Sequence, residues 1–275
     1  MNYRHAYHAG NFADVVKHLA LVAIVLHLRK KQSPFAIIDS HAGRGRYDLA
    51  GDEAARTGEA ANGIGRLAGV RGADGALGEY LRLAGGGATY PGSPALGAAL
   101  LRPQDRLVAI EKHPDEFALL RAALARTRNA HAEGGDGYRR LAALLPPPER
   151  RGLVLIDPPF EAPEEFHAEA RALGAALKRF ATGIYALWFP IKSAAEANAF
   201  CGEVLTAGAA KAVRIDIDIG PSATADGKER LSAAGLIVVN PPHGFAAEMR
   251  ESLAKITPLL SAKARAEVRW LAGDE

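Results

Sequence analysis

The stretch Phe35-Ala-Ile-Ile-Asp39-Ser-His-Ala-Gly-Arg-Gly45 joins a short apolar run to a turn that contains two glycines. Further apolar runs follow along the chain, at 107–111, 153–157, 184–188 and 236–239, and the spacing places one more, weaker strand near 130–133. Helical patterns lie before and between these runs, at about 12–31, 113–127, 162–179, 193–207 and 244–256. Short apolar strands that alternate with helices are typical of a parallel sheet covered on both faces. The sequence therefore predicts an α/β fold built on an open, mostly parallel sheet.

One further segment, 213–219, alternates strictly between apolar and polar residues. Such alternation is typical of a strand with one exposed face. A turn-rich stretch at 220–227 separates this segment from the apolar run at 236–239. We therefore expect the two runs to form an antiparallel pair at the edge of the sheet.

The interval between the first two strands is unusually long. It exceeds sixty residues, from 39 to 107, whereas a simple βα unit needs about half that length. The interval 49–89 contains two weak helical patterns, at 53–68 and 77–84, and no convincing strand. We predict a small helical subdomain inserted at 49–89 into a main domain formed by 1–48 and 90–275. The alternative is a long surface loop.

Composition limits the class of protein. The 275 residues are 48% hydrophobic and 24% charged, which excludes a disordered chain. Cys201 is the single cysteine, so no internal disulfide can form. The apolar run at 19–28 is about half the length of a membrane span, so we expect no membrane partner and a cytoplasmic location. A formal net charge of +3 is compatible with a nucleic-acid partner but does not require one.

Several polar residues follow the predicted strands, where an open parallel sheet binds its ligands. In the first of these turns, Gly43 lets the backbone approach a ligand closely. A dinucleotide fingerprint would need a third glycine at position 48, but Asp48 stands there and would repel a pyrophosphate. The turn therefore favours a nucleoside without phosphates, such as S-adenosylmethionine, over a nicotinamide cofactor. The alternative is a tight turn with no ligand.

Two acids extend this predicted ligand site. Glu111 ends the second strand, at the position where an acid accepts hydrogen bonds from ribose hydroxyls. Asp136 follows the third strand, next to Gly137, and is placed to accept a bond from an adenine amino group. For either acid the alternative is a helix cap or a solvated loop.

The tetrapeptide Asp157-Pro-Pro-Phe160 follows the fourth strand. Two prolines fix a rigid loop, which can hold the Asp157 carboxylate and the Pro158 carbonyl as two acceptors for one exocyclic amine. The Phe160 ring offers a face on which a flipped base can stack. The alternative is a plain strand end with a core phenylalanine. The similar stretch Asn240-Pro-Pro242 follows the predicted edge pair, and we interpret it as structural.

The first eight residues mix aromatic and basic side chains, a composition that suits contact with bases and phosphates. The spacing of His5, His8 and His18 matches no standard metal site, and no cysteine is near. We therefore expect no metal.

Taken together, the motifs resemble one family, the bacterial 23S ribosomal RNA adenine-N6 methyltransferases of the large subunit. They are YRHxxHAGNxAD at 3–14, KH at 17–18, HAGxGRY at 41–47, RTGE at 56–59, YPGSP at 90–94, ExHP at 111–114 and DPPF at 157–160. The resemblance implies a class I, Rossmann-like, S-adenosylmethionine-dependent methyltransferase sheet with a small helical insertion. It also implies residues that hold S-adenosylmethionine, namely His18, His41, Ser93, Glu111, Asp136 and Gly137.

The resemblance further implies that Asp157 is the catalytic acceptor, which we also place beside the cofactor, and that Tyr3 touches the RNA. The tetrapeptide ends in Phe160 where the family more often has tyrosine, so the ring is kept and a hydroxyl is lost. We therefore expect an enzyme that methylates the N6 amino group of an adenine in 23S ribosomal RNA and acts as a monomer. The alternatives are an amino-methyltransferase for DNA adenine, guanine N2 or protein glutamine, and a noncatalytic RNA-binding module.

Overall fold

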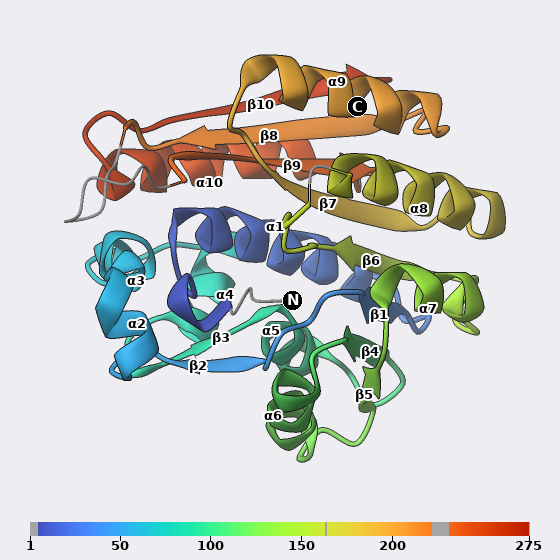
Figure 1. Ribbon diagram of the computed structural model, residues 1–275, viewed down its shortest axis with the longest axis horizontal. Helices are drawn as coiled ribbons and strands as arrows, with labels where there is room; N and C mark the ends of the chain where they lie inside the picture. Colours follow the sequence, from blue (N-terminus) through green and yellow to red (C-terminus); the bar gives the residue numbers. More distant parts are fainter. Residues whose placement is uncertain (1–4, 163, 222–230, 275) are drawn as a thin grey trace.

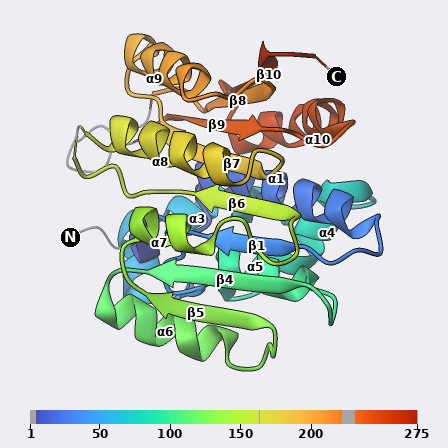
Figure 2. The ribbon, with the colours of Figure 1, turned by 90° about the vertical axis from the view of Figure 1, so that its right-hand side faces the viewer.

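The computed structural model describes residues 5–162, 164–221 and 231–274, and these residues build one large sheet with helices on both sides (Figure 1). Its strands follow in the order β5 (Ala130–Gly134), β4 (Arg106–Glu111), β1 (Ala36–Asp39), β6 (Gly152–Ile156), β7 (Ile184–Pro190), β9 (Ala233–Val239), β8 (Ala212–Asp218) and β10 (Arg265–Ala272). The first five are parallel, whereas β9 is antiparallel to both neighbours. In Figure 2 the arrow of β9 points opposite to those of β4, β1 and β6. The predicted α/β fold is confirmed.

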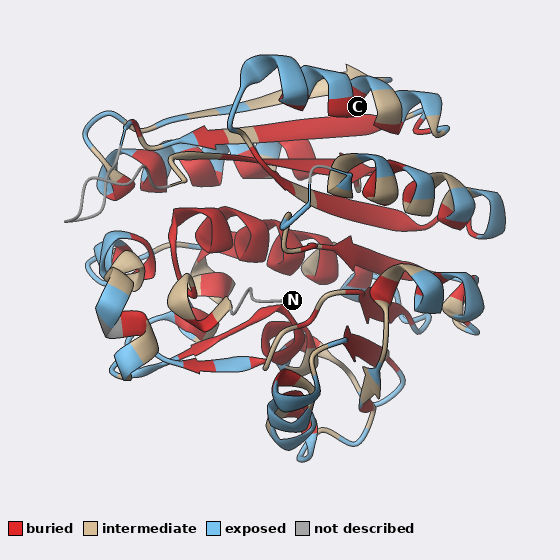
Figure 3. Ribbon diagram, in the orientation of Figure 1, coloured by how far each residue is buried: buried red, intermediate tan, exposed pale blue. Residues whose placement is uncertain are grey.

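Helices cover both faces because neighbouring residues of a strand point to opposite sides of a sheet. Ile37 packs into a core shared with α1 (Phe12–Arg29), α5 (Ser93–Leu100), α6 (Pro114–Leu124) and α10 (Phe245–Leu260). Ile38 packs into a second core shared with α7 (Gly137–Leu144), α8 (Glu165–Arg179) and α9 (Ala194–Thr206). Figure 3 shows the strands largely buried, while α8 and α9 expose their outer sides. Burial on both faces is the reason that these strands are continuous apolar runs.

The expected edge pair forms, but it does not lie at the edge. Strands β8 and β9 are antiparallel, with Ile215 opposite Leu236, and β10 pairs with the other side of β8. The sequence analysis missed β10, although residues 265–270 alternate between charged and apolar side chains as the segment 213–219 does, and none of the residues of β10 is fully buried. An edge strand has one unpaired side and needs no continuous apolar run.

The segment between the first two core strands is mainly helical. It contains α2 (Asp52–Thr57), α3 (Glu59–Asn62), the 3-10 turn η2 (Ile64–Leu67) and α4 (Gly75–Ala84), and the antiparallel strands β2 (Arg46–Asp48) and β3 (Thr89–Pro91) flank it. The single helix expected at 53–68 is wrong, since Gly58 has a φ of 63° and Gly63 ends α3. Of these helices, α3 and α4 pack against α1 (Figure 1). The division into an inserted subdomain and a main domain stays a prediction.

A side-chain cap fixes the start of α1. Asn11 caps the helix by accepting a hydrogen bond from the Asp14 backbone N–H at 2.9 Å. A 3-10 turn, η1 (His5–Tyr7), precedes it. Within the described residues no helix combines the length and the hydropathy that a membrane crossing requires.

Candidate active site

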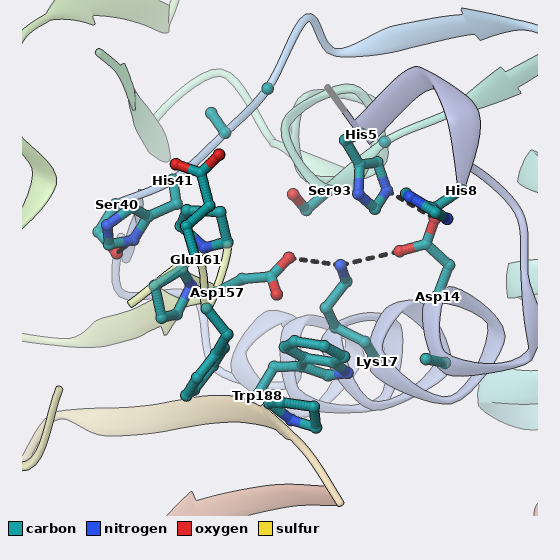
Figure 4. A pocket seen from close by; sticks show the side chains of 18 of the residues that line it. His5, His8, Asp14, Lys17, Ser40, His41, Ser93, Asp157, Glu161 and Trp188 are labelled. Atoms are coloured by element: carbon teal, nitrogen blue, oxygen red, sulfur yellow. Dashed lines mark hydrogen bonds and ion pairs between the residues drawn. The ribbon is translucent and has the colours of Figure 1, made fainter. Parts of the chain in front are cut away.

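A cavity of about 850 Å³ opens where β1, β4 and β6 end (Figure 4). Pockets for cofactor-sized ligands fall in this range of volumes. The predicted site residues that line the cavity are His18, His41, Gly43, Ser93, Glu111, Asp136, Gly137, Asp157 and Phe160. Tyr3 lies outside the described residues. The parallel register explains this convergence, since strands that run the same way end at the same edge of the sheet.

The glycine turn after β1 is fastened to the end of β4. Gly43 has a φ of 62°, and its N–H donates to Glu111 Oε2 at 2.9 Å. The His113 N–H donates to Glu111 Oε1 at 2.7 Å. Burial raises the pKa of Glu111 above its usual value, although these donors oppose the shift. The two N–H donors fix the direction of the carboxylate at the cavity wall.

The start of α7 forms the next part of the wall. A Cβ at Gly137 would overlap the Ser40 carbonyl oxygen, so only glycine allows α7 to approach the turn after β1 this closely. Asp136 caps α7 by accepting from the Arg139 N–H at 3.3 Å, and Lys112 Nζ lies 3.2 Å from its other oxygen. Burial would raise the pKa of Asp136, but these donors lower it below its usual value. The helix-cap alternative therefore describes one oxygen of Asp136 correctly, while the side chain still lines the cavity.

His41 and His18 lie on different sides of the cavity. His41 Nδ1 is 2.8 Å from Ser40 Oγ, and burial lowers the pKa of His41 to about 4. His18 Nδ1 is 2.7 Å from the Tyr90 hydroxyl, and burial lowers the pKa of His18 to about 3. Both rings are therefore neutral at pH 7.

A buried acid connects the turn after β1 to α5. The Ser93 hydroxyl donates to Asp39 Oδ2 at 2.6 Å. Burial raises the pKa of Asp39 to about 7, although the Ser93 bond opposes the shift. Ser93 reaches the cavity from the first residue of α5.

The carboxylate of Asp157 binds the Lys17 ammonium group, and that ammonium also lies 2.8 Å from Asp14 Oδ1 (Figure 4). Only 4% of the Lys17 side chain and 13% of the Asp157 side chain are exposed. Burial would lower the pKa of Lys17, but the two carboxylates raise it well above its usual value. Burial would also raise the pKa of Asp14, yet His5 and Lys17 hold it well below its usual range. One buried lysine therefore holds the carboxyl groups of both aspartates at the cavity wall.

Phe160 ends the rigid loop with an unusual backbone. Its φ is 49°, which is uncommon for a residue with a large side chain. Its ring centroid lies 4.7 Å from that of Phe166 and 5.7 Å from that of Trp188. These aromatic neighbours hold the ring at the wall of the cavity, beside Asp157.

The second Pro-Pro stretch has no place in the cavity, as expected. Because β9 runs antiparallel to β7, its last residues lie at the opposite edge of the sheet. Asn240 there donates to the carbonyls of Ala181 and Gly183, at 2.9 and 2.8 Å. These bonds tie the end of β9 to the turn before β7.

Sequence reasoning missed the partners of Asp157. The pattern left Lys17 and Asp14 without a role, although the helix that carries them is otherwise almost entirely apolar. An aspartate and a lysine three residues apart in such a buried helix are a usable signal, since unpaired buried charges are costly.

A sheet of this order, in which β9 is antiparallel to both of its neighbours and acids at the ends of β4 and β6 face one cavity, is that of a class I methyltransferase that uses S-adenosylmethionine. The family model described as "Ribosomal RNA large subunit methyltransferase D, RlmJ" matches residues 32–272. The chain belongs to this family.

Two curated relatives and one solved structure extend the match over nearly the whole chain. The Ribosomal RNA large subunit methyltransferase J of Escherichia coli K12 is 37% identical over 98% of this chain and 99% of its own. The protein of the same name from Haemophilus influenzae is 36% identical over 94% of both chains. A crystal structure of a Legionella pneumophila protein superposes with a TM-score of 0.87 at 32% identity and covers 98% of this chain and 99% of that one.

Proposed function

We propose that this chain transfers the methyl group of S-adenosylmethionine to the N6 amino group of an adenine in 23S ribosomal RNA. The observation that carries the proposal is the position of Asp157, which faces the same cavity as Gly43 and Glu111. The names of the relatives, which specify large-subunit ribosomal RNA, support this substrate class. We further infer that the protein acts as a monomer in the cytoplasm, where ribosomal RNA is available.

The cavity fits a methyl donor that carries no phosphate. Its wall presents the carboxylates of Glu111, Asp136 and Asp157, which would repel a pyrophosphate and tolerate a sulfonium cation. We assign Glu111 to the ribose hydroxyls and Asp136 to the adenine of the donor. Gly43, His41 and the other predicted binding residues would shape the remaining wall. When bound, S-adenosylmethionine supplies an electrophilic methyl group on a positively charged sulfur.

The chain contributes acceptors for the target amine. The lone pair of an adenine amine is delocalised into the ring, so the amine is a weak nucleophile. Lys17 binds Asp157 Oδ2, and we assign Asp157 Oδ1 and the Pro158 carbonyl to the two amine hydrogens. Two acceptors favour a more tetrahedral nitrogen and stabilise the charge that develops during transfer. Asp157 acts as an acceptor rather than as a base, and the proton leaves after the methyl group has moved.

The aromatic wall would hold the target base. Phe160 and its neighbour Trp188 line the cavity beside Asp157. A base that has left its stack recovers stacking energy on such a ring. Alignment of the amine with the methyl group then accounts for much of the rate, since positioning replaces a bimolecular encounter.

The test is methylation of deproteinised 23S ribosomal RNA that lacks the modification, with labelled S-adenosylmethionine and mass mapping of the product. We expect one N6-methyladenine per RNA. We expect the isosteric variant Asp157→Asn to lose at least about a hundredfold in kcat while its Kd for S-adenosylmethionine, measured by calorimetry, stays close to that of the wild type.

The matched control is Asp74→Asn. Asp74 precedes α4, is exposed and makes no side-chain capping bond, so this variant keeps full activity. Product on duplex DNA, on guanine or on protein instead of adenine in 23S RNA would contradict the proposed substrate. Near-normal turnover of Asp157→Asn would contradict the assignment of that residue.

A further inference from the structure

We propose that the turn Thr57-Gly58-Glu59 is a latch that positions the chain entering α1 and, through it, the residues that hold Asp157. The chain entering α1 is called here the entry segment, residues 7–11. The inference rests on the proposed function, and it gives a role in substrate turnover to Thr57 and Glu59, which would act as positioning residues.

Side chains of the latch bind the entry segment at three points. His8 Nδ1 lies 3.0 Å from Glu59 Oε1 and 3.1 Å from Glu59 Oε2, within hydrogen-bond distance of both carboxylate oxygens. Asn11 Nδ2 donates to Glu59 Oε2 at 3.1 Å. The Thr57 hydroxyl donates to the Tyr7 carbonyl oxygen. The three bonds come from one turn and reach both ends of the entry segment.

The backbones of the two segments also touch. The Ile64 N–H donates to the Gly10 carbonyl oxygen at 2.8 Å. A Cβ on Gly63 would overlap the Gly10 carbonyl oxygen and the Asn11 backbone, so the chains approach as closely as glycine permits. A Cβ on Gly10, whose φ is 76°, would also meet the Ile64 side chain. Gly63 and Ile64, which follow the latch, therefore also hold the entry segment in place.

The local sequence explains why the latch has this shape. Gly58 has a φ of 63°, a conformation that glycine adopts without strain, and it joins the end of α2 to the start of α3. Thr57 therefore ends one helix and Glu59 begins the next, so that both side chains project from the same turn. Open space surrounds the position of a Cβ on Gly58, so its requirement is conformational and not steric.

The entry segment is connected to the catalytic acceptor by a short chain of contacts. The Gly10 N–H donates to Asp14 Oδ2 at 2.9 Å, and His5 Nε2 lies 2.8 Å from the same oxygen. Asp14 Oδ1 holds Lys17, which in turn holds Asp157 (Figure 4). If the entry segment shifts, Asp14 loses the Gly10 N–H, and the carboxylate that fixes one side of the Lys17 ammonium is held less firmly. Thr57 and Glu59 also line the cavity, and the effect proposed here is the one that reaches Asp157 through Asp14 and Lys17.

The test uses the full-length chain and two pairs of variants. Thr57→Val removes the hydroxyl at nearly constant size, and Thr57→Ser restores it. Glu59→Ala removes the carboxylate, and Glu79→Ala is its matched control, because Glu79 lies on α4 in the same inserted segment and binds only Arg82 among the contacts found in the described residues. For each protein we measure hydrogen exchange of the backbone amides of Gly10 and Ile64, RNA methylation kinetics and the Kd for S-adenosylmethionine.

We expect Thr57→Val and Glu59→Ala to speed exchange at both amides and to lower kcat/KM for RNA by about tenfold, the usual effect of one lost hydrogen bond. The Kd for S-adenosylmethionine stays within about twofold of the wild-type value, since the hydrogen bonds of the entry segment described above do not reach the glycine turn or Glu111. Thr57→Ser and Glu79→Ala behave as the wild type. The double variant His8→Ala with Glu59→Ala loses less than the sum of the two single variants, because the two substitutions share the contact between His8 and Glu59.

The outcomes separate this inference from the proposed function. An inactive wild-type enzyme contradicts the proposed function, and exchange at the two amides still decides whether the latch holds the entry segment. Unchanged exchange in Thr57→Val and Glu59→Ala overturns the latch. Faster exchange together with wild-type kcat/KM overturns the positioning role.

Discussion

Lys17, in the second turn of α1, binds the carboxylate of Asp157, which lies 140 residues later in the chain. The pair joins the helix on one face of the sheet to the loop at the end of β6. Because Lys17 also holds Asp14, the orientation of Asp157 depends on an array of charges and not on the proline loop alone. Removal of the lysine therefore affects the stability of the fold and the geometry of the site together.

The variant Lys17→Met should show both effects. It leaves buried carboxylates without their cation, which costs about 3 kcal/mol in the free energy of unfolding, and it abolishes methylation. Denaturant titration and the RNA assay measure the two losses. In the double variant Asp14→Asn with Lys17→Met, one of the uncompensated charges is gone, so we expect part of the stability to return and the activity to stay lost. Active Lys17→Met protein would contradict the role of Lys17.

The neutral state of His18 predicts how acid affects stability. Its pKa falls from 6.5 to about 3 on folding, because burial disfavours the imidazolium ion. Below pH 6.5 the unfolded chain therefore binds a proton that the folded chain does not, and stability falls as the pH decreases toward 3. In wild-type protein this group contributes a slope of up to about 1.4 kcal/mol per pH unit.

In the variant His18→Gln the free energy of unfolding should depend less steeply on pH between pH 6 and pH 4, because the contribution of His18 is gone. Urea unfolding at each pH measures this slope. A direct check is the NMR titration of the His18 ring in folded protein. A ring that titrates near pH 6.5 while the fold is intact would contradict the prediction.

The close approach at Gly137 should make alanine intolerable there. The added methyl group meets the Ser40 carbonyl oxygen, which is backbone and has no freedom to rotate away. We expect Gly137→Ala to cost about 2 kcal/mol of stability and to weaken binding of S-adenosylmethionine, because the turn after β1 must shift. Calorimetric titration and thermal unfolding provide the measurements.

Gly202→Ala is the control for this substitution. Gly202 lies in α9, where a Cβ meets no atom within 4 Å, so alanine there should stabilise the protein by up to about 1 kcal/mol. Equal behaviour of the two alanine variants would refute the steric argument.

The ring of Phe160 should matter more than the hydroxyl that it lacks. Phe160→Leu keeps an apolar side chain but removes the face for stacking, so we expect kcat/KM for RNA to fall by about tenfold. Phe160→Tyr keeps the ring, and we expect kcat/KM to stay near the wild-type value. Steady-state kinetics with the RNA substrate separate the two variants. A large loss in Phe160→Tyr with none in Phe160→Leu would reverse the assignment.

Strand runs such as 107–111 and 153–157 revealed the sheet because parallel strands buried on both faces must be apolar throughout. Residues at their ends, such as Glu111 and Asp157, could be assigned to one cavity because the topology brings those ends together. By contrast, α7 is only eight residues long, too short for a helical period to stand out. α5 was missed because it is built mostly of small and apolar residues without a polar stripe.

Other features depend on contacts between residues that are distant in sequence. The sequence around Lys17 does not indicate that its partner lies 140 residues away. The same holds for Glu59 and His8, which meet across 51 residues. The helix expected at 53–68 was wrong for a local reason, since its glycines at 58 and 63 adopt conformations that a helix does not.

The close contact between Gly63 and the Gly10 carbonyl oxygen limits which segments can be exchanged between related proteins. Two peptide planes meet here without room for a methyl group between them. A chimera that takes residues 57–64 from another protein therefore keeps this contact only if position 63 stays glycine. Any other residue at that position would overlap backbone atoms of Gly10 and Asn11, and no side-chain rotamer can relieve such an overlap.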